Sequence, residues 1–183
     1  MKTLDEHVQN ILITEEEIKE KVKVLAARID SDYAGKEPVL LSILNGSFMF
    51  TADIMRELTI PVGINFIFAS SYGSETVSSG DVKIHNVKGF DPAGKDIIII
   101  EDIIDSGRTL SKIKARLIEE GAASVEICTF LDKPSRRLVD IKAKYTGFEV
   151  PDEFVIGYGL DFDQKYRDLP YISYLEEDDV EAL

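Results

Sequence analysis

Three carboxylates and an anion-binding pattern stand together near the middle of the sequence. The run IIIIEDIIDSGRTL, residues 97–110, places Glu101 and Asp102 directly after four isoleucines, and Asp105 follows three residues later. Adjacent carboxylates repel each other, so a fold keeps such a pair where a cation or a set of hydroxyl groups approaches it. The pair therefore indicates a binding site at the end of a buried strand.

The residues that follow the acids predict a phosphate site. Gly107 permits a tight turn, Ser106 and Thr109 supply hydroxyl groups, and a helix is expected over residues 109–120. The first N–H groups of a helix have no partner within it and favour a phosphate monoester. The loop lacks both G-x-x-x-x-G-K-[ST] and G-x-G-x-x-G, so it is neither of those nucleotide-binding loops. Because carboxylates accept hydrogen bonds from sugar hydroxyls, the run describes a ribose 5-phosphate pocket. The structural alternative is a capped helix with acids in its first turn.

The surrounding sequence predicts an α/β fold with a mostly parallel, twisted sheet flanked by helices. Short apolar runs without strict alternation are joined by helical patterns, which is typical of a parallel sheet covered on both faces. Ligands bind such sheets beyond the carboxyl ends of the strands, where the acids of 97–110 lie. Segment 71–86 is rich in Ser and Gly and is expected to be a loop. Strands are expected over 38–44, 61–70, 95–100, 124–131 and 153–160, and helices after Thr14, within 45–58 and over 109–120.

Composition limits the classes of function. The chain has 183 residues, which suits one domain, and a formal net charge of −13, which argues against non-specific nucleic-acid binding. No apolar run approaches the length of a membrane span, and the first residues lack the apolar stretch of a signal peptide. The single Cys128 excludes an internal disulfide and fits a reducing compartment. A cytoplasmic protein without a membrane or nucleic-acid partner is therefore expected.

The motifs resemble a known family. The run 97–110 resembles the PRPP-binding signature of the type I phosphoribosyltransferases. With Ser-Ser-Tyr-Gly at 70–73 and Phe-Val-Ile-Gly-Tyr-Gly-Leu-Asp at 154–161, it resembles the hypoxanthine (guanine) phosphoribosyltransferases of purine salvage. The resemblance implies one domain over 1–183, with a core at about 37–150 and a small hood built from about 1–36 and 151–183. It also implies transfer of the phosphoribosyl group from PRPP to N9 of a 6-oxopurine, a requirement for Mg²⁺, and a homodimer or homotetramer.

The resemblance assigns roles on the ribose and phosphate side of the site. Asp105 would be the base that manages the proton on purine N7. Glu101 and Asp102 would hold the ribose hydroxyls of PRPP and, with Asp161, would serve the metal. Ser106, Gly107, Arg108 and Thr109 would cradle the 5-phosphate, and Asp105 would lie beside them in the PRPP site.

It also assigns roles at the two ends of the substrates. Lys133 would donate to the purine 6-oxo group and so select against adenine, since an ammonium has donors alone. The purine would also contact Phe154 by stacking, Val155 through its backbone, and Asp161. The pyrophosphate would bind Asn45, Gly46 and Arg167, and the closing loop would carry Ser71 and Tyr72.

One residue departs from the family pattern. In SILNGSF the family usually carries a basic residue before the glycine, next to a non-proline cis peptide, and here that position is Asn45. The resemblance therefore predicts that Leu44–Asn45 is a cis bond. Because Asn supplies no cation, either the backbone N–H binds pyrophosphate or the affinity for it is weaker than in relatives.

Three alternative functions compete with this interpretation, and the sequence excludes the third. An enzyme of the same fold acting on xanthine and guanine would differ at the purine C2 edge, which backbone groups mostly contact. A non-catalytic sensor of PRPP or nucleotides would need a nucleic-acid face, against which the net charge, Asp105 and Lys133 all argue. A phosphoacceptor receiver domain needs an acidic pair after the first strand, where this chain has Leu44, Asn45 and Gly46.

Overall fold

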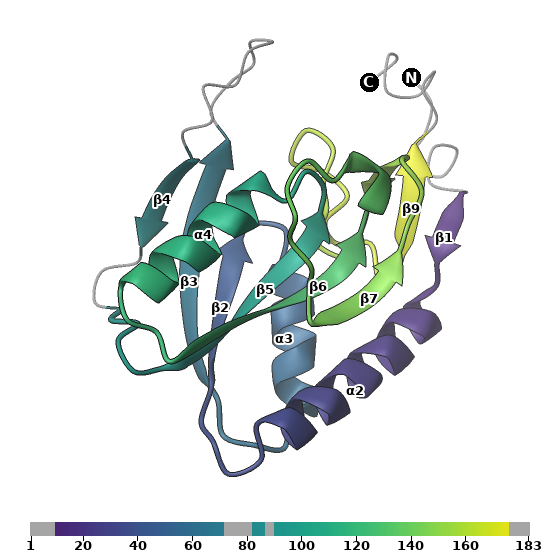
Figure 1. Ribbon diagram of the computed structural model, residues 1–183. Coiled ribbons are helices and arrows are strands. Elements are labelled where there is room, and N and C mark those ends of the chain that lie inside the picture. The colour runs from purple at the N-terminus through teal and green to yellow at the C-terminus, as the bar shows by residue number, and fades with distance from the viewer. Residues whose placement is uncertain (1–9, 72–81, 87–89, 176–183) are drawn as a thin grey trace.

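Six strands form the large sheet of the computed structural model, which describes residues 10–71, 82–86 and 90–175. The strand order is β4-β3-β2-β5-β6-β7, with β4 antiparallel to β3 and every other pair parallel. The arrowheads of the parallel strands therefore point to one end of the sheet (Figure 1). The bounds are β2 Val39–Leu44, β3 Gly63–Ser71, β4 Val82–Asn86, β5 Asp96–Ile104, β6 Ser124–Asp132 and β7 Tyr145–Glu149.

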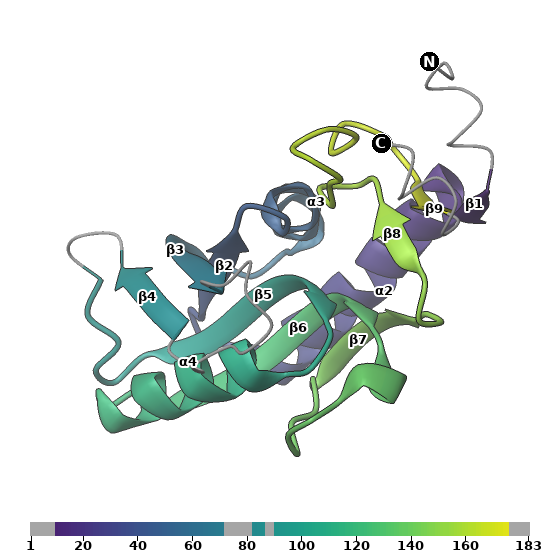
Figure 2. The ribbon, with the colours of Figure 1, turned by 90° about the horizontal axis from the view of Figure 1, so that it is seen from above.

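Helices cover both faces of this sheet. Helices α2 (Glu15–Asp32) and α3 (Phe48–Glu57) lie on one face and α4 (Arg108–Glu119) on the other, as the view from above shows (Figure 2). The four isoleucines of β5 are fully buried and alternate between the layers: Ile98 and Ile100 pack with α2 and α3, while the other two pack with α4. Burial on both faces explains why this strand reads as a continuous apolar run.

The first long helix follows the sequence pattern closely. Thr14 is its N-cap, and a capping box with Glu17 is present: the Glu17 N–H donates to the Thr14 hydroxyl, and Thr14 N–H donates to the Glu17 carboxylate. The predicted apolar stripe is the buried face. It consists of Ile18, Val22, Leu25, Ala26 and Ile29.

A second, smaller sheet brings together segments from the two ends of the chain. Its order is β1-β9-β8, all antiparallel, with β1 at Ile11–Ile13, β8 at Phe154–Ile156 and β9 at Ile172–Leu175. The loop of residues 157–171 between β8 and β9 lies beyond the arrowheads of β2 and β5 (Figure 1). This arrangement agrees with a small hood over the carboxyl ends of the strands, while its domain boundaries stay a prediction.

The structure corrects three expectations about strands. The run 153–160 is not a fifth strand of the large sheet, because its strand β8 belongs to the small sheet; the fifth parallel strand is β7. Strand β7 contains Gly147, at which a Cβ atom would lie 2.3 Å from the Phe130 carbonyl oxygen, so its glycine serves a close backbone approach that weakens the strand signal. Segment 71–86 is not wholly a loop, since Val82–Asn86 forms the edge strand β4.

Strand β5 is longer than the predicted 95–100. It continues to Ile104 because its neighbour β6 continues to Asp132 and pairs with it there. Glu101 and Asp102 are therefore residues of the strand itself. No helix in the described part of the chain has the length and apolarity that a membrane span requires.

Candidate active site

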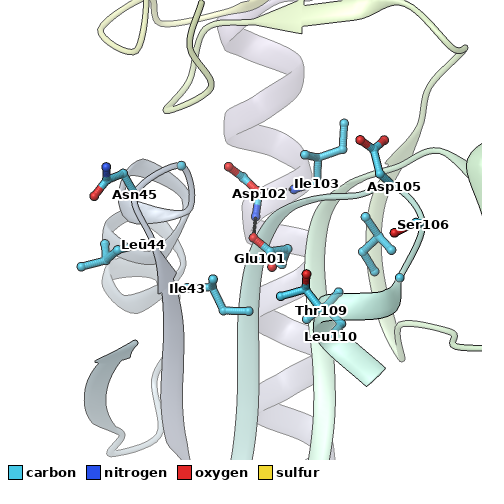
Figure 3. Close-up of a pocket in the computed structure, with 13 residues that line it drawn as sticks. Ile43, Leu44, Asn45, Glu101, Asp102, Ile103, Asp105, Ser106, Thr109 and Leu110 are labelled. Carbon is cyan, nitrogen blue, oxygen red and sulfur yellow. Dashed lines mark hydrogen bonds between the residues drawn. The ribbon is translucent and has the colours of Figure 1, made fainter. Parts of the chain in front are cut away.

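A cavity of about 270 Å³ opens at the carboxyl ends of β2 and β5. It is bordered by the loop after β2, the end of β5 and the start of α4, and the predicted acids and hydroxyls are among the residues that line it (Figure 3). The chain thus brings together, in one cavity, residues more than 50 positions apart in sequence. The lining consists of Ile43, Leu44, Asn45, Gly46, Glu101, Asp102, Ile103, Ile104, Asp105, Ser106, Gly107, Thr109 and Leu110.

The two adjacent carboxylates border the cavity from different layers. Successive strand residues point to opposite faces, so Glu101 falls on the α4 side and Asp102 on the α3 side. The Asp102 N–H donates to Glu101 Oε1 at 3.3 Å, and the Ile103 N–H donates to Asp102 Oδ1 at 2.7 Å. Burial, and then the charge of Asp102, hold the pKa of Glu101 well above its usual range. Burial also raises the pKa of Asp102, against hydrogen bonds and the Arg167 charge that lower it.

The loop after β2 touches the second carboxylate. The Leu44–Asn45 peptide is cis, which confirms the prediction. At Gly46 a Cβ atom would lie 1.4 Å from Asp102 Oδ2, so only glycine leaves that carboxylate its place. From the other side, a Cβ atom at Gly159 would lie 2.1 Å from the Gly46 carbonyl oxygen. The loop is therefore packed tightly between β5 and the segment that follows β8.

The start of α4 has the geometry of an anion cradle. Gly107 is its N-cap at φ +76°, in the left-handed region that favours glycine. A Cβ atom there would lie 2.5 Å from Ile141 Cγ2, which adds a steric demand for glycine. The Arg108 N–H approaches Ser106 Oγ at 3.4 Å. The side chain of Arg108 is exposed, and Arg108 does not line the cavity, unlike its neighbours Gly107 and Thr109.

Asp105 connects this cradle with a buried lysine. Lys133 is 5% exposed, its Nζ lies 4.0 Å from Asp105 Oδ1, and it donates to the Glu153 carbonyl at 2.6 Å. The next residue, Phe154, is 44% exposed and makes an edge-to-face contact with Phe162 at 5.5 Å between ring centroids. Asp105, the predicted base, is therefore next to Lys133, the predicted purine donor, and Lys133 contacts the residue before Phe154, the predicted stacking ring.

Arg167 and Asp161 form a separate cluster on the loop after β8. Asp161 Oδ1 lies 2.8 Å from Arg167 Nη2, and Asp161 Oδ2 accepts from the Gln164 N–H at 2.9 Å. Arg167 also donates to the Gly159 carbonyl at 2.7 Å. Gly159 packs against the Gly46 carbonyl, so this cluster lies beside the loop that carries Asn45 and Gly46.

Some predicted residues are not brought together. Among the described residues no group of three or more His, Cys, Asp or Glu side chains forms a metal cluster, so Glu101, Asp102 and Asp161 do not gather around one point. Val155 is buried in β8, opposite Tyr174 of β9. Ser71 and Tyr72 are predicted on a closing loop: Ser71 is instead the last residue of strand β3, and Tyr72 lies outside the described residues.

Sequence reasoning missed several contributors. The apolar cavity residues Ile43, Ile103 and Leu110 carry no signal that separates them from core. The Glu153 carbonyl that fixes Lys133 is a backbone group, which composition cannot reveal. Ser42 is a polar residue inside an apolar strand, and that single departure is the signal that could have identified it.

The raised pKa of Glu101 predicts a gain in stability when its charge is removed. A carboxyl group with a raised folded-state pKa binds more protons in the folded than in the unfolded protein, so the stability of the wild type falls as pH rises above the unfolded value near 4.5. Glu101→Gln stays neutral at every pH. At pH 8 without Mg²⁺ we therefore expect the variant to be more stable than the wild type, with a Tm higher by a few degrees.

Thermal unfolding at pH 5 and pH 8 checks this expectation. The advantage of Glu101→Gln should shrink toward pH 5, because the raised pKa of Glu101 lets the wild type take up the proton that removes the buried charge. Glu20→Gln, at an exposed position of α2, is the matched control and should leave Tm nearly unchanged. If the variant is equally or less stable than the wild type at pH 8, the buried charge of Glu101 does not destabilise the folded protein.

Comparison with known proteins agrees with this geometry. Residues 8–163 match the family model of the phosphoribosyl transferase domain. The chain is 48% identical to the hypoxanthine phosphoribosyltransferase of Salmonella typhimurium over 169 residues, covering 91% of this chain and 95% of the relative. It is 48% identical to the hypoxanthine-guanine phosphoribosyltransferase of Bacillus subtilis over 171 residues, covering 92% and 94%.

Solved structures give the same result. A crystal structure of a hypoxanthine phosphoribosyltransferase from Staphylococcus aureus superposes with a TM-score of 0.90 at 43% identity, covering 96% of this chain and 95% of that one. The resemblance that the motifs suggested is thereby confirmed, together with the fold class. The chain belongs to the phosphoribosyl transferase family.

Proposed function

We propose that the protein transfers the 5-phosphoribosyl group from PRPP to N9 of a 6-oxopurine, giving IMP from hypoxanthine and GMP from guanine, with release of pyrophosphate. The observation that carries the proposal is the cavity in which the buried Glu101, the half-buried Asp102 and a glycine-capped helix N-terminus meet at the carboxyl ends of parallel strands. The names of the similar proteins support the same activity.

The ribose 5-phosphate half of PRPP fits the first part of the cavity. The carboxylates of Glu101 and Asp102 accept hydrogen bonds from the ribose hydroxyls. The Ser106 and Thr109 hydroxyls and the first N–H groups of α4 bind the 5-phosphate. The tight fit around Gly107 supports this role, because it fixes the loop before any ligand arrives.

The purine is proposed to lie between the cradle and the small sheet. An ammonium has three N–H donors, and the bond to Glu153 directs one of them and orients Lys133 for the 6-oxo group. The exposed face of Phe154 is available for stacking, and the backbone of Val155, with Asp161 nearby on the following loop, meets the other edge. As N9 attacks the anomeric carbon and the bond to pyrophosphate breaks, Asp105 accepts the proton from N7.

The donor set of the cavity fits Mg²⁺. The groups of Glu101 and Asp102 that face it are oxygen atoms, which this ion prefers, and it commonly keeps water and substrate phosphates as its other ligands. That preference agrees with the lack of a third carboxylate beside the pair in the described residues. Bound Mg²⁺ neutralises charge on the departing pyrophosphate. Asp161 holds Arg167, which binds the pyrophosphate with the backbone of Asn45 and Gly46.

Assembly and location follow as part of the proposal. We expect a homodimer or homotetramer that works in the cytoplasm, with a closing segment around Ser71 and Tyr72 that keeps water from the reacting centre. The fully buried thiol of Cys128 suits a reducing compartment. The net charge of −13 argues against a nucleic-acid partner.

A four-way assay tests the proposed reaction. Purified protein is incubated with PRPP and Mg²⁺ and with hypoxanthine, guanine, xanthine or adenine, and nucleotide formation is followed. We expect product from hypoxanthine and guanine, and none from adenine or after Mg²⁺ is removed with EDTA. If no base gives product while the protein still binds PRPP, the proposed enzyme activity is wrong and a PRPP sensor is favoured.

A further inference from the structure

Three hydroxyl side chains form a closed network beneath the loop that carries Asn45 and Gly46. Ser42 on β2, Ser47 at the end of the loop and Thr51 on α3 are 0%, 0% and 2% exposed. Ser42 Oγ and Ser47 Oγ are 2.7 Å apart, and Thr51 Oγ1 lies 2.8 Å from Ser42 Oγ. These are polar side chains in a layer that is otherwise built from apolar ones.

Two backbone carbonyl groups that flank the loop accept hydrogen bonds from the network. Ser47 Oγ donates to the Ile43 carbonyl at 2.6 Å, and Thr51 Oγ1 approaches the Ser47 carbonyl at 2.8 Å. Because the Ser47 proton is used on Ile43, Ser42 must donate to Ser47. Thr51 then donates to Ser42 or to the Ser47 carbonyl, so three hydroxyl protons serve four contacts.

The position of Ser47 argues that the network is not an ordinary helix cap. Serine at an N-cap usually accepts a hydrogen bond from the first turn of the helix. Ser47 is the N-cap residue of α3 and makes no such bond; its hydroxyl turns back across the loop to residue 43. The hydrogen bond therefore closes the three-residue segment 44–46 at its base.

That segment faces the proposed pyrophosphate site. Its Asn45 and Gly46 border the cavity, and Gly46 lies against the Asp102 carboxylate. Asn45 supplies no cation, so anion binding here depends on the direction of backbone groups. Groups that must bind without rearrangement have to be held in place before the ligand arrives.

We propose that Ser42, Ser47 and Thr51 are positioning residues for the pyrophosphate end of PRPP: their hydroxyl network fixes the backbone of residues 44–46 for binding. The inference rests on the proposed function and names residues that touch no substrate. An apolar side chain in place of Ser47 would fill the same space. It would remove the hydroxyl that donates to the Ile43 carbonyl, and the loop could then move.

The test compares two substitutions at one buried site. Thr51→Val keeps the shape and removes the hydroxyl, whereas Thr51→Ser keeps the hydroxyl. Calorimetry with Mg²⁺ measures Kd for PRPP and for IMP, which lacks pyrophosphate. We expect Thr51→Val to weaken PRPP binding about tenfold and to leave IMP within a factor of two, while Thr51→Ser binds both ligands like the wild type.

Ser173→Ala is the matched control. Ser173 is equally buried and donates to the Asn10 carbonyl at 2.9 Å in the small sheet, away from the loop. It should bind PRPP like the wild type. Equal loss of PRPP and IMP binding in Thr51→Val, equal loss in both Thr51 variants, or no loss would overturn the positioning role. Wild-type protein that binds neither ligand would instead overturn the proposed function.

Discussion

Asp105→Asn should lose about 10²–10⁴-fold in kcat, the usual contribution of a general acid or base. The side chain borders the cavity, and Lys133 Nζ lies 4.0 Å from its Oδ1. An amide has the shape of the carboxyl group but does not accept the N7 proton as the bond to N9 forms. PRPP binding should change little, because the ribose and phosphate contacts come from other groups of the cavity.

Rapid mixing at saturating PRPP and hypoxanthine measures this loss, and calorimetry measures Kd for PRPP. Asp140→Asn, at an exposed position, is the matched control and should keep full turnover. Full turnover in Asp105→Asn would remove this residue from the reaction. A large loss of PRPP binding would make Asp105 a ligand-binding group instead of a base.

Lys133→Met should lower kcat/KM for hypoxanthine about 10–100-fold and relax the selection against adenine. A hydrogen bond from a charged group contributes about 1.5–3 kcal/mol, and this ammonium is buried. Methionine has nearly the same length without the charge. The 6-amino group of adenine then no longer faces an ammonium that it cannot pair with, so the ratio of hypoxanthine to adenine rates should fall at least about tenfold.

Steady-state kinetics with both bases test this selection. Lys142→Met, at an exposed position, is the matched control. Because Lys133 also holds the Glu153 carbonyl, Tm is measured in parallel to separate a change of base preference from a loss of folding. An unchanged ratio of the two bases, with hypoxanthine still used well, would exclude Lys133 as the purine donor.

The features that could be predicted from the sequence are those that depend on residues close together in the chain. The capping box of Thr14 and Glu17 and the stripe from Ile18 to Ile29 are local, so they determine α2 without knowledge of the rest. The buried run 97–100 and the turn at Gly107 likewise follow from adjacent residues. Two carboxylates and a phosphate loop within ten residues sufficed to describe half of the cavity.

Long-range packing determined what the sequence could not predict. Strand β7 is an edge strand, and its Gly147 is dictated by the Phe130 backbone across the sheet. The short strand β8 is apolar like a core strand, but its partner is β9 near the end of the chain. Gly46 is packed between Asp102 and Gly159, so three segments that are distant in sequence meet there. None of these contacts leaves a periodic pattern.

The order β1-β9-β8 has a consequence for synthesis on the ribosome. Strand β1 is among the first described residues to emerge, yet its neighbour in the small sheet is β9, at Ile172–Leu175. The large sheet can form while translation continues, since domains generally begin folding from the N-terminal side. The small sheet cannot form until β9 has been synthesised. A nascent chain stalled near residue 160 would therefore hold the cavity lining of β5 and α4 before β9 has been made to pair with β1 and β8.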